Sequence, residues 1–142
     1  MNDLDLAIFN MKKNNLSLVF MKNGKTIFES NKNGLSSFIE AINSHNQDLR
    51  NTSVADKVVG KAAALLGVYA EIKTVYASTL STEGYRILKK HNIPVKYNKM
   101  TEKILNNQGT DLCPFEKSVL NIDEPKEALI TIKKTIQILS RQ

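Results

Sequence analysis

The sequence predicts an α/β protein of three layers, α-β-α, with a mixed sheet of about four strands. Two β-rich runs near the N-terminus flank an Asn-Gly pair, which indicates an antiparallel hairpin. Farther along, single strands alternate with single helices, which is the order that builds parallel strands. The 142 residues contain no internal repeat and no low-complexity tract. We therefore expect a single domain that spans residues 1–142, with the hairpin and the parallel strands in one sheet.

The first forty residues are expected to form a helix, the hairpin and a second helix. Leu4–Asn14 has aspartates early and lysines late, and these charges match the dipole of a short amphipathic helix. Leu16–Met21 and Thr26–Ser30 are the two strands of the hairpin. Apolar residues recur at the helical period over Leu35–Ile42, and the polar stretch His45–Asn51 is expected to be a linker.

The stretch Ser53–Gly67 is expected to be one buried helix at the centre of the fold. In a helix it would be apolar over most of its circumference, with Ser53 as N-cap and Gly67 as the C-terminal stop. Asp56 would then lie in the first turn, where a carboxylate can accept hydrogen bonds from free N–H groups. Lys57 would oppose the helix dipole, so it either extends into water or faces a ligand.

The second half is expected to supply two more strands and three helical segments. Ile72–Ala77 and Ile93–Tyr97 are rich in β-branched and aromatic residues, which favours strands. Thr82–His91 is expected to be the helix between them, and Thr101–Leu105 one or two helical turns. The last helix is expected to begin at Pro125 and run to about Leu139. Ligands of such sheets bind where strands end and helices begin.

Composition excludes several classes of protein. The net charge of +6 comes mostly from lysines spread through the chain, with only three arginines, so nucleic-acid binding is not expected. No apolar run approaches the roughly 20 residues of a membrane span, and the N-terminus lacks the pattern of a signal peptide. A single cysteine excludes an internal disulfide. We expect a cytoplasmic protein that does not interact with membranes.

Two strings carry a resemblance to a known family. ADKVVGKAAA (Ala55–Ala64) and CPFE (Cys113–Glu116), at this separation, resemble an uncharacterised prokaryotic family, the domain-of-unknown-function family eighteen-ninety-three. That family is similar in fold to the cytidine deaminases, and the resemblance covers nearly the whole chain. It implies a cytidine-deaminase-like fold more than an activity.

Zinc-dependent deamination is nevertheless expected to be absent. Zinc deaminases carry His-x-Glu or Cys-x-Glu at the start of the helix equivalent to Ser53–Gly67, and Pro-Cys-x-x-Cys at the start of the next helix. Here the corresponding residues are Ala55–Lys57 and Thr79–Glu83, which contain neither histidine nor cysteine. The remaining soft ligands are scattered along the chain: His45, His91 and Cys113. We therefore expect no metal site and no cofactor; the two histidines are expected at helix C-termini.

Cys113–Glu116 allows two interpretations. Pro114 suits the first position of a helix, which makes Cys113 the N-cap and lets Glu116 fold back in a capping box. The motif is then only a helix start. Alternatively, the helix N-terminus stabilises the thiolate and lowers the pKa of Cys113. Glu116 would oppose that effect unless Lys57 or Lys61 compensates.

A turn rich in hydroxyl groups is a second candidate site. Ser78, Thr79, Ser81 and Thr82 lie between a predicted strand and a predicted helix. Their hydroxyl groups suit either hydrogen bonding of a sugar or phosphate, or ordinary capping of the helix.

Three functional hypotheses follow. The first is binding of a nucleotide-like or other anionic small molecule, with a metal-independent enzyme as its catalytic version. In that version Asp56 or Glu116 is the acid/base, Lys57 stabilises an anion and Cys113 is a nucleophile or redox group. The second is a regulatory or assembly module, a homo-oligomer and preferably a dimer, formed through the seam of the last helix. The seam of the last helix consists of four apolar residues: Leu129, Ile132, Ile136 and Leu139. The third hypothesis is a thiol-redox sensor.

Overall fold

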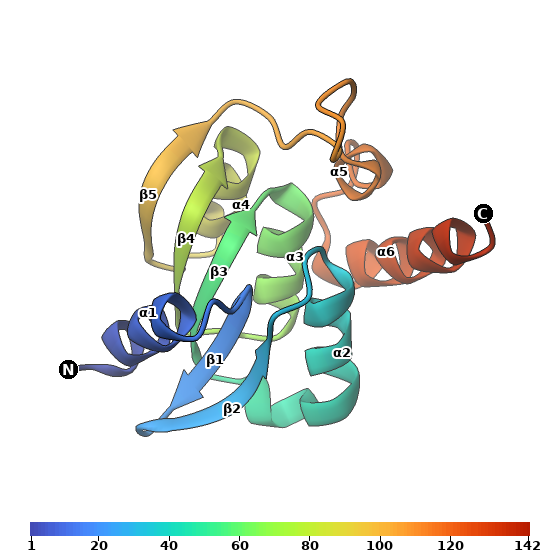
Figure 1. Ribbon diagram of the computed structural model, residues 1–142. Helices are drawn as coiled ribbons and strands as arrows, with labels where there is room; N and C mark the ends of the chain where they lie inside the picture. Colours follow the sequence, from blue (N-terminus) through green and yellow to red (C-terminus); the bar gives the residue numbers. More distant parts are fainter.

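The computed structural model describes all 142 residues, and it contains a five-stranded mixed sheet in the order β2-β1-β3-β4-β5 (Figure 1). Strands β1 (Leu18–Lys22) and β2 (Lys25–Ser30) form the predicted hairpin. Strand β1 also pairs antiparallel with β3 (Ser53–Val59), and β3 pairs parallel with β4 (Thr74–Ser81). Strand β5 (Val95–Thr101) adds a further parallel edge. The predicted α/β class with a hairpin and parallel strands is confirmed.

Helices cover both faces of this sheet, as Figure 1 shows. Helix α1 (Asp3–Lys13) packs on β1, β3 and β4 from one side. The opposite side carries α2, α3 and α4, and α5 and α6 pack on α3. The end of α6 extends away from the body of the protein (Figure 1). The bounds of the remaining helices are α2 Ser36–His45, the 3-10 helix η1 Asn46–Leu49, α3 Lys61–Tyr69, α4 Thr82–Lys90, α5 Pro114–Ser118 and α6 Pro125–Ser140.

The side-chain alternation of β1 separates two cores. Leu18 and Phe20 point into a cluster of 26 buried residues between the sheet and the helices α2 to α4. Val19 and Met21 point the other way, into a cluster of 7 buried residues beneath α1. Because both faces of the central strands are covered, apolar residues occur on both faces of these strands, and they lack the regular polar alternation that usually identifies a strand in a sequence.

The prediction of one helix over Ser53–Gly67 is wrong. Its first half is β3, which lies between β1 and β4, and its second half is α3, which continues past Gly67 to Tyr69. A central strand buried on both faces and a buried helix have the same apolar composition, so periodicity alone does not separate them. The three valines of this stretch, Val54, Val58 and Val59, favour a strand, and Gly60 lies at the turn between strand and helix.

Three shorter predictions also need correction. Strand β4 continues through Ser81, so Ser78 and Thr79 belong to a strand and not to a turn. Thr101–Leu105 is not helical, because β5 ends at Thr101 and Leu105 forms an isolated bridge with Leu112. The stretch predicted as a linker contains η1, which is anchored by a fully buried Leu49. His45 and His91 do lie at helix C-termini, as predicted.

The succession β3-α3-β4-α4-β5 determines where a site can form. Each parallel strand is followed by a helix that leads back over the same face, so the strand ends and the starts of α3 and α4 share one edge of the sheet. None of the helices is both long enough and apolar enough to cross a membrane.

Candidate functional site

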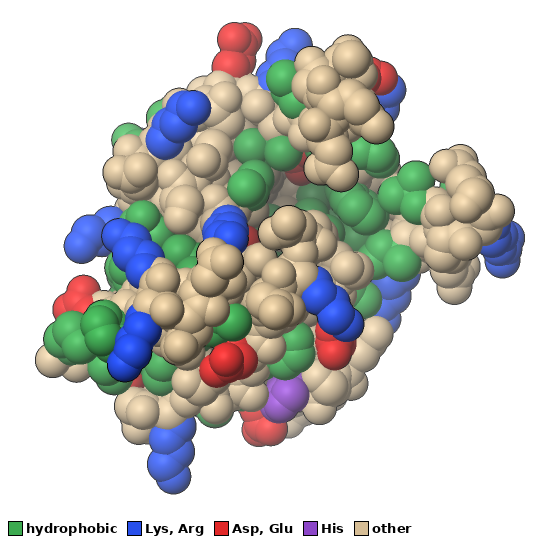
Figure 2. Space-filling model, viewed as in Figure 1, with side chains coloured by type: hydrophobic (Ala, Val, Ile, Leu, Met, Phe, Trp, Pro, Cys, Tyr) green, Lys and Arg blue, Asp and Glu red, His purple; other side chains and the backbone are tan.

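A cavity of about 530 Å³ opens beside the C-terminal half of β3. Pairing with β1 ends at Leu18 and Asp56, so the remaining residues of β3 have no strand neighbour on that side. The space is bounded by the segment before α2, by the loop between β5 and α5, and by the start of α5. Figure 2 shows the hollow between these segments, with hydrophobic side chains on its floor.

The cavity brings together all four residues that the sequence proposes as catalytic: Asp56, Lys57, Cys113 and Glu116. They come from β3 and from the start of α5, which are more than fifty residues apart in the sequence. None of the four predicted ligand-binding hydroxyl residues lines it; these are Ser78, Thr79, Ser81 and Thr82. The structure thus brings the predicted catalytic residues together and places the predicted ligand-binding hydroxyl residues elsewhere.

Asp56 is the principal ionisable group of the cavity. It pairs in the sheet with Leu18 and Ala77, and alternation along β3 directs its side chain to the α3 side together with Val54. Its Oδ1 accepts a long hydrogen bond of 3.3 Å from the backbone N–H of Val58. Protein atoms closely surround the carboxylate, and this burial raises the pKa of Asp56 from 3.8 to about 7. Asp56 can therefore gain and lose a proton near neutral pH.

The side chain of Lys57 does not lie beside that of Asp56. Because it is the next residue of a strand, its side chain leaves from the opposite face of the sheet. Its Nζ lies 3.5 Å from Oδ1 of Asn15, just beyond the end of α1. Lys57 thus borders the cavity while its amine has a partner elsewhere.

Glu116 caps a helix other than its own. Its Oε1 accepts a hydrogen bond from the backbone N–H of Lys61 and its Oε2 one from that of Ala62, both at 2.8 Å. These are free N–H groups of the first turn of α3, where the helix dipole also favours a negative charge. The predicted capping box within α5 is therefore wrong. Burial raises the pKa of Glu116, and the two N–H groups and the Lys61 ammonium counteract that rise.

Gly60 makes the approach of Glu116 possible. A Cβ atom at position 60 would lie only 2.2 Å from Oε1 of Glu116, so any other residue would displace the carboxylate. Glycine is required here for space and not for its backbone angle, because its φ is −100°. Gly84 has a comparable role in α4, since a Cβ there would lie 2.9 Å from the carbonyl oxygen of Val59. Close packing therefore joins the β3–α3 turn to both α4 and α5.

Lys61, which the sequence suggested only as a counter-charge to Glu116, has a structural role. Its side chain is buried, and Nζ donates to the carbonyl oxygens of Val119 and Leu120 and pairs with Asp123 at 2.9 Å. Asp123 also pairs with Arg86 of α4. The Arg86 guanidinium and the Lys61 ammonium hold the pKa of Asp123 well below its usual range. This cluster fixes the α5–α6 connection against α3. The sequence signal that could have identified this buried lysine is its position inside an apolar run, directly after a glycine.

Of the remaining predicted residues, Ser81 and Thr82 have local hydrogen-bond partners. Cys113 is the N-cap of α5, as predicted, but its side chain accepts no capping hydrogen bond, and the residue is half-buried. The hydroxyl of Ser81 accepts from the N–H of Gly84 and caps α4. Thr82 donates to the carbonyl oxygen of Glu102. The capping interpretation therefore holds for Ser81.

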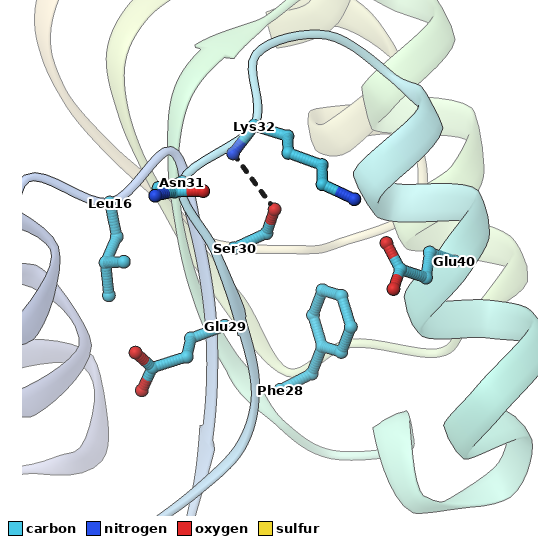
Figure 3. A pocket seen from close by; sticks show the side chains of 7 residues that line it. All are labelled: Leu16, Phe28, Glu29, Ser30, Asn31, Lys32 and Glu40. Carbon is cyan, nitrogen blue, oxygen red and sulfur yellow. Dashed lines mark hydrogen bonds between the residues drawn. The ribbon is translucent and has the colours of Figure 1, made fainter.

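The correction in β3 also moves the position to be compared with the zinc deaminases. The helix there begins at Lys61, so its start reads Gly60-Lys61-Ala62, which again lacks histidine and cysteine. No three His, Cys, Asp or Glu side chains of the protein lie in a group that could hold a metal ion. A second hollow, of about 320 Å³, lies along β2, away from the predicted residues (Figure 3).

The fold and the side chains define an α/β protein with a deaminase-like sheet and without a zinc ligand set. The chain belongs to the DUF1893 family, because the family model described as "TM1506: Domain of unknown function (DUF1893)" matches residues 7–136. A solved structure of a DUF1893 family protein from Thermotoga maritima, TM1506, is similar with a TM-score of 0.87 and 30% identity. That match covers 94% of this chain and 89% of that chain, and it confirms the resemblance inferred from the sequence.

A second solved structure relates the fold to a deaminase. The diaminohydroxyphosphoribosylaminopyrimidine deaminase/5-amino-6-(5-phosphoribosylamino)uracil reductase of Thermotoga maritima matches with a TM-score of 0.50 and 20% identity. The match covers 82% of this chain and 40% of that chain, and it shows the fold alone. No curated protein gives a significant match to the sequence.

Proposed function

We propose that the cavity beside β3 binds a nucleotide-like small molecule. The observation that carries this proposal is the meeting of Asp56, Cys113 and Glu116 in one cavity, from segments distant in the sequence. Its volume of about 530 Å³ lies in the usual range of small-molecule sites, roughly 300–1,000 Å³.

The lining suits a flat ring with polar edges. Apolar side chains such as Phe38 and Phe115 offer surfaces for the faces of a ring. The amides of Asn33, Asn107 and Gln108 offer both donors and acceptors for its edges. The related deaminase from Thermotoga maritima is named for a phosphoribosylaminopyrimidine, which is a ring compound of this kind. The analogy of fold supports a ring-shaped ligand and does not extend to zinc chemistry.

In a catalytic version of this site, Asp56 is the acid/base and Cys113 the nucleophile or redox group. A pKa of about 7 suits proton transfer at neutral pH. Lys57 remains a candidate anion-stabilising residue only if its side chain leaves Asn15. Glu116 already accepts two backbone hydrogen bonds and is better suited to holding the cavity wall.

A thermal-shift screen with nucleosides, nucleotides and free bases tests the binding proposal. Leu105→Trp narrows the cavity from an exposed position, whereas Leu120→Trp makes the same change at an exposed position outside it. We expect a compound that raises the melting temperature of the wild type and of Leu120→Trp but has less effect on Leu105→Trp. No shift with any compound in the wild-type protein would refute the proposal.

One observation favours assembly as a second candidate function. Leu129 and Ile132 of the predicted seam pack inside the protein, but Ile130, Ile138 and Leu139 of α6 are exposed. The proposed occupant of this outer face is a second copy of the chain. Light scattering at high concentration is the test, and a monomer at every concentration would refute it. The thiol-sensor hypothesis also remains a prediction, and alkylation of Cys113 as a function of pH tests it.

A further inference from the structure

Asp56 is the one acidic group of the cavity that has hydrogen-bonding capacity to spare. Glu116 uses one oxygen for each of two N–H groups of α3. Asp56 accepts a long hydrogen bond from the N–H of Val58, the backbone N–H of Lys57 also stabilises its charge, and it forms no ion pair. An ionised carboxylate has roughly four acceptor positions, so Asp56, which lines the cavity, has acceptor positions left for a ligand. Ionising a carboxylate that protein atoms surround and that has no charged partner costs free energy. A ligand that supplies hydrogen-bond donors to it reduces that cost.

The two lysines that border the cavity do not supply these donors. Lys57 extends from the opposite face of β3 and has its partner in Asn15. Figure 3 shows the Lys32 side chain running toward α2, where its amine points toward Glu40. The buried Lys61 ammonium has three acceptors of its own in Val119, Leu120 and Asp123. Neither Lys32 nor Lys57 forms an ion pair with Asp56, so the carboxylate has no cationic partner in the cavity.

We propose that Asp56 pairs with a ring edge that presents two adjacent N–H groups, as the 2-aminopyrimidinone edge of guanine does. This inference rests on the proposed small-molecule function and specifies which part of the ligand the site recognises. Two parallel N–H···O bonds to one carboxylate fix the ring plane as well as the position. The phosphate or sugar of a nucleotide-like ligand then lies toward solvent, since no arginine borders the cavity.

The ring edge that Asp56 recognises depends on the protonation state of its carboxyl group. An ionised Asp56 accepts two hydrogen bonds and selects two donors. A protonated Asp56 donates one bond and accepts one, so it would select the acceptor–donor edge of adenine. The pKa of about 7 means that both states are accessible in the empty protein, and a two-donor ligand shifts the equilibrium to the ionised state.

Calorimetric titration at pH 8 with guanosine, inosine and adenosine tests the proposal. Inosine differs from guanosine only in lacking the 2-amino donor. Loss of one hydrogen bond to a charged group corresponds to about a 10- to 100-fold weaker affinity, so guanosine is expected to bind that much tighter than inosine. Asp56→Asn is expected to abolish this preference. Asp48→Asn, the same change at an exposed carboxylate, is expected to retain it. Guanosine monophosphate is expected to bind no tighter than guanosine.

The outcomes separate this inference from the proposed function. Equal affinities for guanosine and inosine, with binding still sensitive to Leu105→Trp, would overturn the pairing with Asp56 and leave the binding function intact. Tighter binding of adenosine would show that the protonated carboxyl is the recognising group, and would overturn it too. A gain of tenfold or more from the phosphate would show that Lys32 or Lys57 reaches the phosphate, and would overturn its placement toward solvent. No binding of any nucleoside, nucleotide or free base would overturn both proposals.

Discussion

Replacing Asp56 with asparagine is expected to stabilise the protein above neutral pH. The change removes the ionisable group, and an asparagine oxygen can still accept the N–H of Val58. Burial raises the pKa of Asp56 from 3.8 to about 7. The folded state therefore binds this proton more tightly than the unfolded state does, and stability is lost as pH rises between these two values. Above the folded-state pKa of Asp56 this loss of stability is complete.

The magnitude follows from the size of the pKa shift. Each pKa unit corresponds to about 1.4 kcal/mol, so a rise of about three units has an upper limit of about 4 kcal/mol. Asp56 also borders an open cavity, where water screens its charge, so we expect about half of that limit, about 2 kcal/mol. The other ionisable groups at the cavity are Lys32, Lys57, Cys113 and Glu116, none of which pairs with Asp56.

Urea unfolding at pH 5 and pH 8 measures the effect. The free energy of unfolding of Asp56→Asn is expected to exceed that of the wild type by about 2 kcal/mol at pH 8 and by less than about 1 kcal/mol at pH 5. Asp48→Asn, at an exposed position, is expected to match the wild type at both values. A gain that does not grow with pH, or a loss of stability at pH 8, would refute the reasoning about burial.

Three further substitutions test how the cavity wall is held. Glu116→Gln is expected to cost about 1–3 kcal/mol in urea unfolding, because one of the two N–H groups of α3 loses its charged acceptor. Gly84→Ala is expected to cost about 2 kcal/mol in the same assay, because the new Cβ would lie 2.9 Å from the carbonyl oxygen of Val59. Lys61→Met is expected to cost about 2–4 kcal/mol, because two buried carbonyl oxygens and a carboxylate lose their ammonium partner.

The changes at Glu116 and Lys61 have controls at exposed positions of the same protein. Glu102→Gln and Lys89→Ala are expected to stay within about 0.5 kcal/mol of the wild type. If Glu116→Gln changes the free energy of unfolding as little as Glu102→Gln does, the N–H groups of α3 form hydrogen bonds with water instead. A neutral Gly84→Ala would mean that α4 can move away from the β3–α3 turn.

Local signals were sufficient to predict the elements at the two ends of the chain. The hairpin follows from Asn23-Gly24, because both residues adopt the positive φ angles that this tight turn requires. Helix α6 follows from Pro125 after two acidic residues and from its apolar spacing. Local signals did not separate β3 from α3, because burial on all sides removes the polar positions that reveal the period of an element.

Three of the four cavity residues proposed from the sequence, Asp56, Lys57 and Glu116, were expected in positions that differ from those in the structure. Asp56 and Lys57 were expected together in the first turn of a helix, but they lie on opposite faces of a strand. Glu116 was expected to cap its own helix, but it caps α3, 54 residues away in sequence from Ala62. A capping motif specifies that free N–H groups need an acceptor, and only packing decides which acceptor reaches them.

The sequence by itself determined the α/β class, the hairpin, the family resemblance and the lack of zinc ligands at the expected positions. These depend on residue identity and short-range spacing, which are independent of packing. Only the tertiary structure decided that Ser53–Val59 is a central strand, that Glu116 caps α3, and that Asp56 faces a cavity in which no cation pairs with it. Those properties depend on which distant segments become neighbours, and a single sequence does not record such contacts.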